Sequence, residues 1–580
     1  MNIMQIDKVI MDRVNSWLTG GYDEQTKCQI REMLQNNSAE VVESFYKNLE
    51  FGTGGLRGKM GVGTNRMNIY TVGGATQGLA NYLKEVFKDL PEIKVAVACD
   101  SRNNSAMFSK TVANVFAANG IKVFLFESLR PTPELSFTIR HFGCQSGVVV
   151  TASHNPKIYN GYKAYWNDGG QVVAPHDKNI INHVNSIKSI EDIKWTGGEK
   201  NITIIGDDVD RVYLGKIKDL SLSPDIIKQH SDLKIVYTSI HGSGYRLVPH
   251  ILKEYGFSNV FTVKEQMVPD GNFPTVVNPN PEEPTAMKMG IDMADSVGAS
   301  LLIATDPDAD RIGVAVRDSS GKMILLNGNQ TASIVTYYLL TRMKELGRLH
   351  GGEFIVKTVV TTDLLVKIAK SFGVDYYNVL TGFKFIASKI KELEGKSKYI
   401  CGGEESYGFL IGDFVRDKDA ISCSAMVCEA AAWAASNGIT LYDLLVDIYV
   451  EYGFFKEGLL SITKEGKSGA EEIIAMMSSI RNNPPHVICG ENVITIADYE
   501  KRTSLNVKTG VITKIEYPVS DVLQFITDGD TIVSMRPSGT EPKIKFYFGV
   551  REALPSKNDF EKVNQKAIDK IERIKKEMNL

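Results

Sequence analysis

Three aspartates alternate with other residues in the segment Asp306-Pro307-Asp308-Ala309-Asp310. Alternate residues of an extended segment share a face, so we expect the three carboxylates to converge. Like charges about 4 Å apart repel by roughly 4 kcal/mol at an effective dielectric constant near 20, so such a cluster needs a cation or protons. Ligands that are all oxygen favour magnesium, calcium or manganese over zinc. The spacing therefore predicts a divalent metal site.

An EF-hand loop also begins with three alternating acids, but it needs glycine at its sixth position and an acid at its twelfth. Here those positions hold Arg311 and Arg317, which excludes an EF-hand. Three acids with few other ligands leave coordination positions open for water or for a phosphate oxygen. Magnesium is usually held in this way.

A serine follows a second apolar run. Gly147-Val148-Val149-Val150 is typical of a buried strand, and Thr151-Ala152-Ser153-His154-Asn155-Pro156 follows it. This order places Ser153 on a tight loop at the carboxyl end of a strand, where open α/β sheets bind ligands. A serine in a loop more often caps the next segment. Here Lys163 is near enough in sequence to stabilise a phosphorylated serine, and the motif suggests a serine that handles phosphate.

A glycine-rich segment, Phe51–Gly58, carries Arg57 in its middle. Four glycines in eight residues predict a loop rather than a helix or strand interior. The arginine offers a fork of donors that suits phosphate. The segment lacks the Gly-Lys-Ser/Thr ending of a nucleotide-binding P-loop, and taken alone it is equally consistent with a surface turn.

The segment Thr151–Pro156 is similar to the active-serine loop of the α-D-phosphohexomutase superfamily, which includes phosphoglucomutases and phosphomannomutases. Three further stretches resemble motifs of the same family in the same order: Asp306–Arg311, Gly403-Glu404-Glu405-Ser406 and Arg536-Pro537-Ser538-Gly539-Thr540. The resemblance implies that phospho-Ser153 donates its phosphate to a hexose 1-phosphate at O6. The resulting 1,6-bisphosphate turns over and returns its other phosphate to the serine, which leaves the hexose 6-phosphate.

The resemblance also assigns roles to residues. Arg57 falls where the family keeps an arginine near the transferring phosphate, and His154 and Lys163 are unranked candidates for the general acid and base. One magnesium ion is expected on Ser153, Asp306, Asp308 and Asp310, and glucose 1,6-bisphosphate is expected as intermediate and activator. The expected substrate-binding residues are Arg311, Lys384, Glu404, Ser406, Arg536, Ser538, Gly539, Thr540 and Lys545.

The motifs define the reaction more closely than they define the sugar of the substrate. The region from Phe51 to Asn68 looks most like the branch of bacterial phosphoglucomutases and phosphoglucomutase/phosphopentomutases. Tyr407 and Gly408 follow Ser406 where dual-specificity phosphomannomutases place a histidine. We therefore expect glucose phosphate, with mannose or pentose phosphate as alternatives. A metal-dependent sugar phosphatase and a silent sugar-phosphate binder are rival readings; the Arg536 motif favours a mutase, which must hold a substrate by its far end.

The elements that must position these residues alternate between strand and helix patterns. Three such cycles predict an α/β fold of three tandem domains with mixed sheets covered by helices, and short strands after about Tyr452 predict a smaller α+β domain. The expected boundaries are 1–205, 206–322, 323–455 and 456–580, arranged around a central cleft. The first forty residues are expected to be helical, with an amphipathic stretch around Asp23–Leu34.

Composition narrows the remaining classes. With 66 basic and 69 acidic residues the net charge is −3, which gives no general attraction to nucleic acid or to an anionic membrane. Seven cysteines without a C-x-x-C pair argue against a disulfide framework or a structural zinc site. The amino terminus lacks a signal-peptide pattern, and 18 consecutive uncharged apolar residues do not occur. We expect a cytoplasmic monomer or homodimer that binds a small sugar phosphate.

Overall fold

The computed structural model describes residues 6–52, 54–464, 466–537 and 543–580. Within them the chain forms two compact units. The first unit runs to Asn327 and also takes in Ala387–Cys401 and Ser406–Asn437. The second unit comprises Gly328–Ile386, Gly402–Glu405 and Gly438–Leu580.

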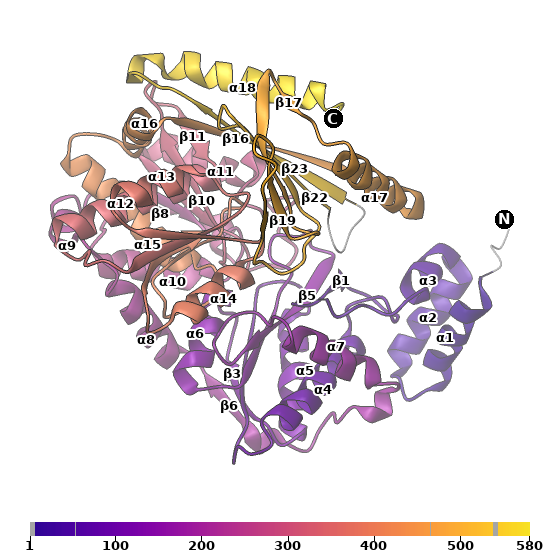
Figure 1. Ribbon diagram of the computed structural model, residues 1–580. Coiled ribbons are helices and arrows are strands. Elements are labelled where there is room, and N and C mark those ends of the chain that lie inside the picture. Colours follow the sequence, from indigo (N-terminus) through magenta and orange to yellow (C-terminus); the bar gives the residue numbers. More distant parts are fainter. Residues whose placement is uncertain (1–5, 53, 465, 538–542) are drawn as a thin grey trace. The chain divides into compact units, whose positions relative to one another are not determined.

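The first unit begins with three short helices, α1 (Lys8–Thr19), α2 (Glu24–Asn36) and α3 (Ser38–Phe45). Side chains of Asp7, Asp23 and Asn37 accept hydrogen bonds from free N–H groups at the three helix starts, which stabilises each N-terminus. The helices lie side by side in Figure 1, and α2 confirms the predicted amphipathic stretch. Their shared apolar core consists of Val14, Trp17, Ile30, Val41 and Phe45.

The next part of the first unit is a six-stranded mixed sheet in the order β1-β5-β4-β2-β3-β6. The central strands are parallel, and β4 confirms the strand predicted from the run Gly147–Val150. Helices α5 and α6 both contact these strands. The strands are β1 (Gly55–Lys59), β2 (Lys94–Cys99), β3 (Lys122–Phe126), β4 (Ser146–Val150), β5 (Tyr159–Trp166) and β6 (Ile202–Ile205). The helices are α4 (Ile69–Val86), α5 (Ser105–Ala118), α6 (Thr132–Phe142) and α7 (His176–Ser186).

One element of this sheet differs from the prediction. The glycine-rich segment was expected to be a loop throughout, but its second half forms strand β1, which pairs antiparallel with β5. The position of Gly55 requires glycine. Its φ is +139°, and a Cβ atom at this position would lie 1.7 Å from the carbonyl oxygen of Tyr162. Glycine is thus needed for close backbone approach within a sheet, and it does not break the strand.

A second mixed sheet follows, in the order β11-β10-β9-β7-β8. Strand β7 is parallel to β8 and β9, whereas β10 runs antiparallel to β9 and β11. The strands are β7 (Ile235–Thr238), β8 (Val260–Thr262), β9 (Leu301–Thr305), β10 (Ile312–Arg317) and β11 (Met323–Leu326). The helices are α8 (Asp207–Lys218), α9 (Pro224–Gln229), α10 (Gly244–Tyr255) and α11 (Pro284–Val297).

The third α/β part is shared between the two units. Its segments in the second unit include the parallel pair β12 (Glu353–Thr358) and β13 (Asp375–Val379) with helices α12 (Gly328–Glu345), α13 (Leu364–Ser371) and α16 (Leu441–Tyr452). Strand β15 (Phe409–Ile411) and helix α15 (Ala420–Ser436) belong to the first unit, where α15 packs on α10. Helix α14 (Phe383–Leu393) and strand β14 (Lys398–Gly403) pass from one unit to the other.

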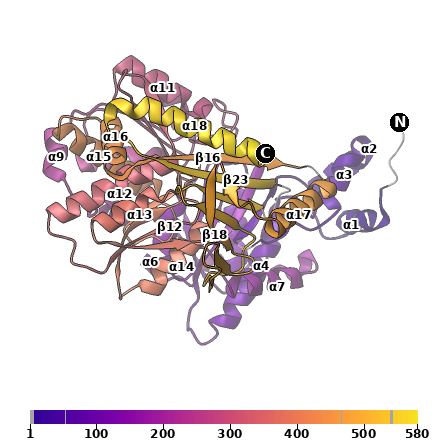
Figure 2. The same ribbon diagram turned by 45° about the horizontal axis from the view of Figure 1, so that its top comes forward.

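The second unit ends in an antiparallel sheet in the order β16-β23-β22-β21-β18-β19-β20, with β17 (Val487–Ile488) on β18. Figure 2 shows helix α18 (Phe560–Glu577) lying along β16 and β23. Within this contact, Ile571 packs against Gly458. The other elements are β16 (Phe454–Thr463), α17 (Gly466–Asn482), β18 (Glu491–Asp498), β19 (Thr503–Asn506), β20 (Ile512–Lys514), β21 (Leu523–Thr527), β22 (Ile532–Pro537) and β23 (Lys543–Glu552). This confirms the predicted smaller α+β part.

Three α/β parts with mixed sheets and a C-terminal β-rich part are therefore the architecture of the chain, as the strand and helix patterns predict. Among the helices in the described ranges, none has both the length and the apolar character that crossing a bilayer would require.

Candidate active site

The serine loop leaves the end of strand β4. Ser153 has a φ of +51°, a left-handed conformation that is uncommon for a residue other than glycine. Two contacts anchor its amide: Ser153 N–H donates to Thr151 Oγ1 at 2.8 Å, and that hydroxyl donates to Asp100 Oδ2 at 2.7 Å. The loop is therefore built to hold Ser153 in a strained conformation, which is a feature of functional sites.

The Ser153 hydroxyl faces the aspartate cluster. Its Oγ donates to Asp306 Oδ2 at 2.7 Å and lies 3.1 Å from Nδ1 of His154. The serine side chain is buried, as are all three aspartates. Two motifs that lie 153 residues apart in sequence are thus joined by a direct hydrogen bond in the first unit.

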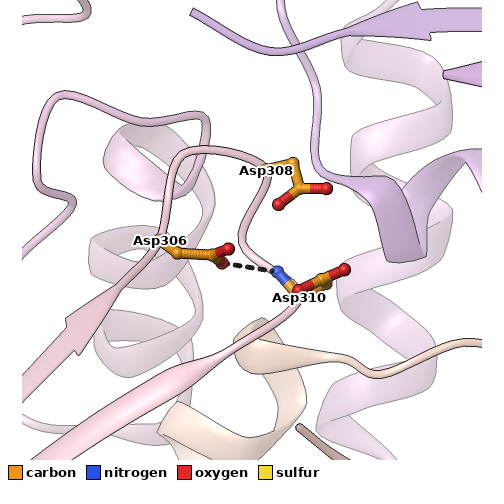
Figure 3. A group of neighbouring side chains, drawn as sticks. All are labelled: Asp306, Asp308 and Asp310. Carbon is orange, nitrogen blue, oxygen red and sulfur yellow. Dashed lines mark hydrogen bonds between the residues drawn. The ribbon is translucent and has the colours of Figure 1, made fainter. Parts of the chain in front are cut away.

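The three carboxylates converge as expected, but for a different reason. The segment after β9 is a tight turn and not an extended strand: Ala309 has a φ of +51° and its N–H donates to the carbonyl of Asp306 at 2.9 Å. The N–H groups of Asp310 and Arg311 both donate to Asp306 Oδ1 at 3.1 Å. Figure 3 shows the three side chains pointing to a common space, with the first of these bonds dashed.

The arrangement fits a metal ion. Asp306, Asp308 and Asp310 each place one carboxylate oxygen within 4.8 Å of the others. In addition, Oδ1 of Asp308 and Oδ1 of Asp310 are buried and have no hydrogen-bond partner. Buried carboxylate oxygens without a donor are costly unless a cation satisfies them. The described residues therefore support a metal-binding site made of oxygen ligands.

Electrostatics separate the roles of the aspartates. Burial, and then the charges of Asp308 and Asp310, raise the pKa of Asp306 well above its ordinary value. Burial has the same tendency at Asp310, but Lys163, Lys418 and Arg311 outweigh it and hold the pKa of Asp310 below its ordinary value. A divalent cation at the cluster would favour the ionised form of Asp306, the aspartate whose pKa burial and its neighbours raise.

Two lysines supply the counter-charge. Lys163 Nζ donates to Asp308 Oδ2 at 2.7 Å and to Asp310 Oδ2 at 3.1 Å, and Lys418 Nζ lies 3.3 Å from the same oxygen of Asp310. Burial disfavours the charged form of Lys163, yet the two aspartates overcome this and raise its pKa. Thr132, at the start of α6, adds a hydroxyl donor to Asp308 Oδ2 at 2.8 Å.

His154 and the two predicted arginines lie around this centre. Burial, and then the positive charges of Arg311 and Arg57, hold the pKa of His154 well below its ordinary value, so the imidazole is neutral near pH 7. Arg57 lies on β1 opposite Gly161 of β5 and is exposed. Arg311 Nη1 pairs with Glu282 Oε1 at 2.5 Å. The first unit therefore brings together all four residues expected to be catalytic.

Sequence reasoning missed two contributors. Lys418 was not singled out, although it stands in a charged run, Asp417-Lys418-Asp419, between apolar segments, and that pattern is a usable signal. Arg102, which follows β2, was not assigned a role either. Its side chain is fully buried, and Nη2 donates to the carbonyl of Ser153 at 2.5 Å.

The substrate-binding residues expected further along the chain lie mainly in the second unit. Glu404 Oε1 accepts from the N–H of Gly382 at 3.0 Å, and Lys384 is in the first turn of α14. Arg536 and Lys545 are cross-strand neighbours on β22 and β23. Ser406 belongs to the first unit, and Ser538, Gly539 and Thr540 lie outside the described residues.

Glu405, which was not assigned a role, is half-buried beside the hydroxyls of Thr358 and Thr361, each 3.4 Å from its Oε2. Burial, and then the charge of Glu404, raise the pKa of Glu405 to about 7, although Lys545 and Arg536 oppose the shift. The glutamate pair and the two cations of the C-terminal sheet thus influence one another within the second unit.

Comparison with known proteins agrees with this geometry. Residues 48–191, 211–321 and 327–452 match, in order, the alpha/beta/alpha domains I, II and III of phosphoglucomutase/phosphomannomutase. These matches cover more than half of the chain. The protein belongs to the phosphoglucomutase/phosphomannomutase family, and the predicted superfamily is confirmed. It is an enzyme of the isomerase class that transfers phosphate.

Two phosphoglucomutases are similar to this chain over most of its length. A phosphoglucomutase of Staphylococcus saprophyticus is 36% identical over 537 residues, which cover 89% of this chain and 95% of the relative. One from Staphylococcus aureus strain MRSA252 is 36% identical over 532 residues, covering 92% and 94%.

Solved structures show the same fold. A phosphoglucomutase/phosphomannomutase family protein of Burkholderia thailandensis aligns with a TM-score of 0.65 at 18% identity and covers 93% of this chain and 98% of its own. The open form of parafusin, a phosphoglucomutase of Paramecium, aligns with a TM-score of 0.65 at 17% identity and covers 91% and 96%.

Proposed function

We propose that this enzyme is a phosphoglucomutase that interconverts glucose 1-phosphate and glucose 6-phosphate through phospho-Ser153 and a 1,6-bisphosphate. The observation that carries the proposal is the 2.7 Å hydrogen bond between Ser153 Oγ and Asp306 in a buried carboxylate cluster. It joins a nucleophile to a metal site, as phosphoryl transfer requires. The names of relatives at 36% identity support glucose as the sugar.

Ser153 and the three aspartates would hold magnesium, which would neutralise the phosphate on Ser153 and polarise its phosphorus. Lys163 keeps Asp308 and Asp310 oriented through its two short contacts. Arg57 and Arg311 add positive charge where the transferring phosphoryl group spreads its negative charge. The buried setting strengthens each of these interactions.

In the transfer step, the sugar O6 hydroxyl gives its proton to a base as its oxygen bonds to phosphorus. The bond between phosphorus and Ser153 Oγ breaks, and the serine oxygen takes up a proton. His154 is a candidate for this exchange because its neutral imidazole lies 3.1 Å from the serine oxygen. Lys163 is the other predicted candidate, and Lys418 joins them because it faces the same carboxylate.

The second unit carries the proposed substrate readers. Glu404, with Ser406 of the first unit, would bind adjacent sugar hydroxyls, and Lys384 would assist. Arg536, Lys545 and the segment 538–540 would grip the phosphate that does not react, because guanidinium and backbone N–H groups suit a phosphate dianion. A grip on the far end of the substrate distinguishes a mutase from a phosphatase.

The finer points of the assignment are part of this proposal. They comprise domain boundaries at 205, 322 and 455, a cytoplasmic location, a monomer or homodimer, and glucose 1,6-bisphosphate as activator. Mannose 1-phosphate and ribose 1-phosphate are the alternative substrates, since the stereochemistry of one hydroxyl is decided by pocket geometry.

The test is magnesium-dependent conversion of glucose 1-phosphate to glucose 6-phosphate, with and without trace glucose 1,6-bisphosphate, run beside mannose 1-phosphate and ribose 1-phosphate. We expect fast glucose turnover that the bisphosphate stimulates and that Ser153→Ala abolishes. Release of inorganic phosphate in proportion to substrate consumed would instead establish a phosphatase. Retained turnover in Ser153→Ala would remove the serine from the mechanism.

A further inference from the structure

A single arginine holds the backbone of the serine loop. Nη1 of Arg102 donates to the carbonyls of Pro156 and Tyr159 at 3.0 and 3.1 Å, and Nη2 donates to those of Ser153 and Asn155. The Arg102 side chain has no exposed surface. A guanidinium has four terminal N–H bonds, and here all four have backbone oxygens as partners.

These contacts identify what Arg102 does. Because its four terminal N–H groups are used by the loop, they are not available to bind a substrate phosphate. The carbonyl of Pro156 also accepts from the N–H of Tyr159 at 3.0 Å, so Arg102 adds a second donor there. Its other contacts give the carbonyls of Ser153, Asn155 and Tyr159 a charged donor, which fixes the irregular path of the loop.

Asp100 connects the two anchors of the nucleophile. Its Oδ2 accepts from the hydroxyl of Thr151, and that hydroxyl in turn accepts from the Ser153 N–H. The same Oδ2 lies 3.4 Å from Nε of Arg102, the residue that holds the Ser153 carbonyl. Its Oδ1 accepts from the Arg102 N–H at 2.9 Å and from Ser105 at 2.8 Å. The residues that hold the Ser153 N–H and the Ser153 carbonyl are therefore both held by the buried Asp100 carboxylate.

The loop before α11 covers the same arginine. The Phe273 ring lies 5.1 Å from the Arg102 guanidinium, and Asn272 accepts a hydrogen bond from Asn103 at 3.0 Å. A Cβ atom on Gly271 would lie 2.2 Å from Asn103 N, so this cover is in close backbone contact. This cover helps to bury the guanidinium, whose side chain has no exposed surface.

We propose that Arg102, braced by Asp100, is the positioning residue that fixes the nucleophile Ser153 in its left-handed conformation, with its hydroxyl on Asp306. The inference rests on the proposed phosphoryl transfer at Ser153, but the contacts themselves do not depend on the sugar. A lysine at this position would keep the charge and reach at most part of the four carbonyls.

The test compares Arg102→Lys and Arg102→Met with Arg317→Met. Arg317 is a matched control because it also grips backbone carbonyls, those of Ala294, Ala299 and Gly321, at the far end of β10 from Arg311. Three readouts are taken on the full chain: amide exchange of residues 151–159, phosphorylation of Ser153 by glucose 1,6-bisphosphate followed by intact mass, and kcat with KM.

We expect both Arg102 variants to lose amide protection in the serine loop and kcat to fall by about 100-fold in Arg102→Met, because misplacing a reacting group by about 1 Å has an effect of this size. KM should stay within about 3-fold, the Lys variant should be intermediate, and Arg317→Met should leave kcat and the loop amides unchanged. If Arg102→Met does not fold, Arg102→Lys decides alone.

The inference is overturned if a folded Arg102 variant keeps the loop protection and kcat of the natural chain, or if Arg317→Met loses as much. A natural chain that isomerises none of the sugar phosphates would refute the proposed function. In that case loop exchange and Ser153 phosphorylation still decide whether Arg102 positions the serine.

Discussion

At the scale of single residues, the site is a balance of charge around Asp310. Lys163 and Lys418 both face its Oδ2, although they lie 255 positions apart in the chain. The charge of one lysine would satisfy the carboxylate oxygen. We therefore expect one lysine to hold the carboxylate while Lys418 exchanges a proton with substrate.

Replacing Lys418 tests this division. We expect Lys418→Met to lower kcat by about 100-fold or more, the range of a lost acid or base, with KM within about 3-fold. Lys418→Arg restores the charge beside Asp310 but cannot release a proton at neutral pH, so it should stay slow. Kinetics of both variants, beside exposed Lys234→Met as control, check the prediction. Recovery of kcat in the arginine variant would show that Lys418 contributes charge alone.

Glu405 makes the stability of the second unit depend on pH, and this dependence can be measured without an activity assay. Its pKa of about 7 in the folded chain lies above its ordinary value of 4.5. Between these values the folded state keeps a proton that the unfolded state has lost, so this stabilisation is full below pH 4.5 and is lost as the pH rises to about 7. The effect is on the order of 1.4 kcal/mol per unit of pKa difference.

Glu405→Gln should remove the loss of stability between pH 4.5 and about 7, because a glutamine side chain does not ionise. The opening free energy of β12, measured by amide exchange between pH 4.5 and 8, should fall with pH in the natural chain and fall less steeply in the variant. Glu392→Gln, an exposed change on α14, serves as control. Parallel profiles for the natural chain and Glu405→Gln would show that Glu405 is ionised in the folded state throughout.

At the scale of elements, strands and helices were predictable from the sequence where buried β-branched runs and 3.6-residue periodicity give local signals. The run Gly147–Val150 and the amphipathic stretch Asp23–Leu34 are examples, found as β4 and α2. β1 was not predictable, because Gly55 is required by its contact with β5, more than 100 residues later.

The site follows the same rule. Ser153 and the three aspartates could be found from motifs, because each motif is contiguous. Lys418 and Arg102 could not be assigned, because their roles depend on contacts across the fold: Lys418 with Asp310, and Arg102 with carbonyls more than 50 residues away. The mutual approach of carboxylates was predicted, but the turn at Ala309 that produces it was not.

The N-terminal helices precede the part of the chain that matches the family, and they clamp the turn after β1. Arg66 is buried, pairs with Glu40 of α3 at 2.8 Å and donates to the carbonyl of Glu43 at 3.0 Å. The N–H of Asn65 donates to the carbonyl of Ser44 at 2.9 Å. The turn that follows Arg57 is therefore held by the end of α3.

Glu40→Gln should weaken this clamp. We expect the free energy of unfolding to fall by about 1 kcal/mol, because a hydrogen bond to a buried charge is weakened while Glu40 itself is half exposed. Glu24→Gln, which removes a largely exposed partner of Lys27, should change it by less than about 0.5 kcal/mol. Denaturant unfolding of both variants measures the difference, and equal effects would contradict the clamp.

At the scale of the whole molecule, the proposed metal binds one unit only. All three aspartates belong to the first unit, so magnesium should stabilise that unit and leave the second unchanged. At a concentration 100 times its Kd the gain is about 2.7 kcal/mol. Amide exchange of β9 and β12, with magnesium and with a chelator, separates the units. Asp308→Asn should abolish the shift at β9, and an equal shift at β12 would contradict a site confined to the first unit.

The chain passes between the two units five times, after Asn327, Ile386, Cys401, Glu405 and Asn437. During synthesis the aspartate turn leaves the ribosome more than 100 residues before Lys418, the second lysine that contacts Asp310. At about 5–20 residues per second this interval lasts several seconds or more. A nascent chain would spend it with Lys163 as the one lysine of the pair available to the cluster, so a divalent cation bound there would stabilise the first unit before Lys418 arrives.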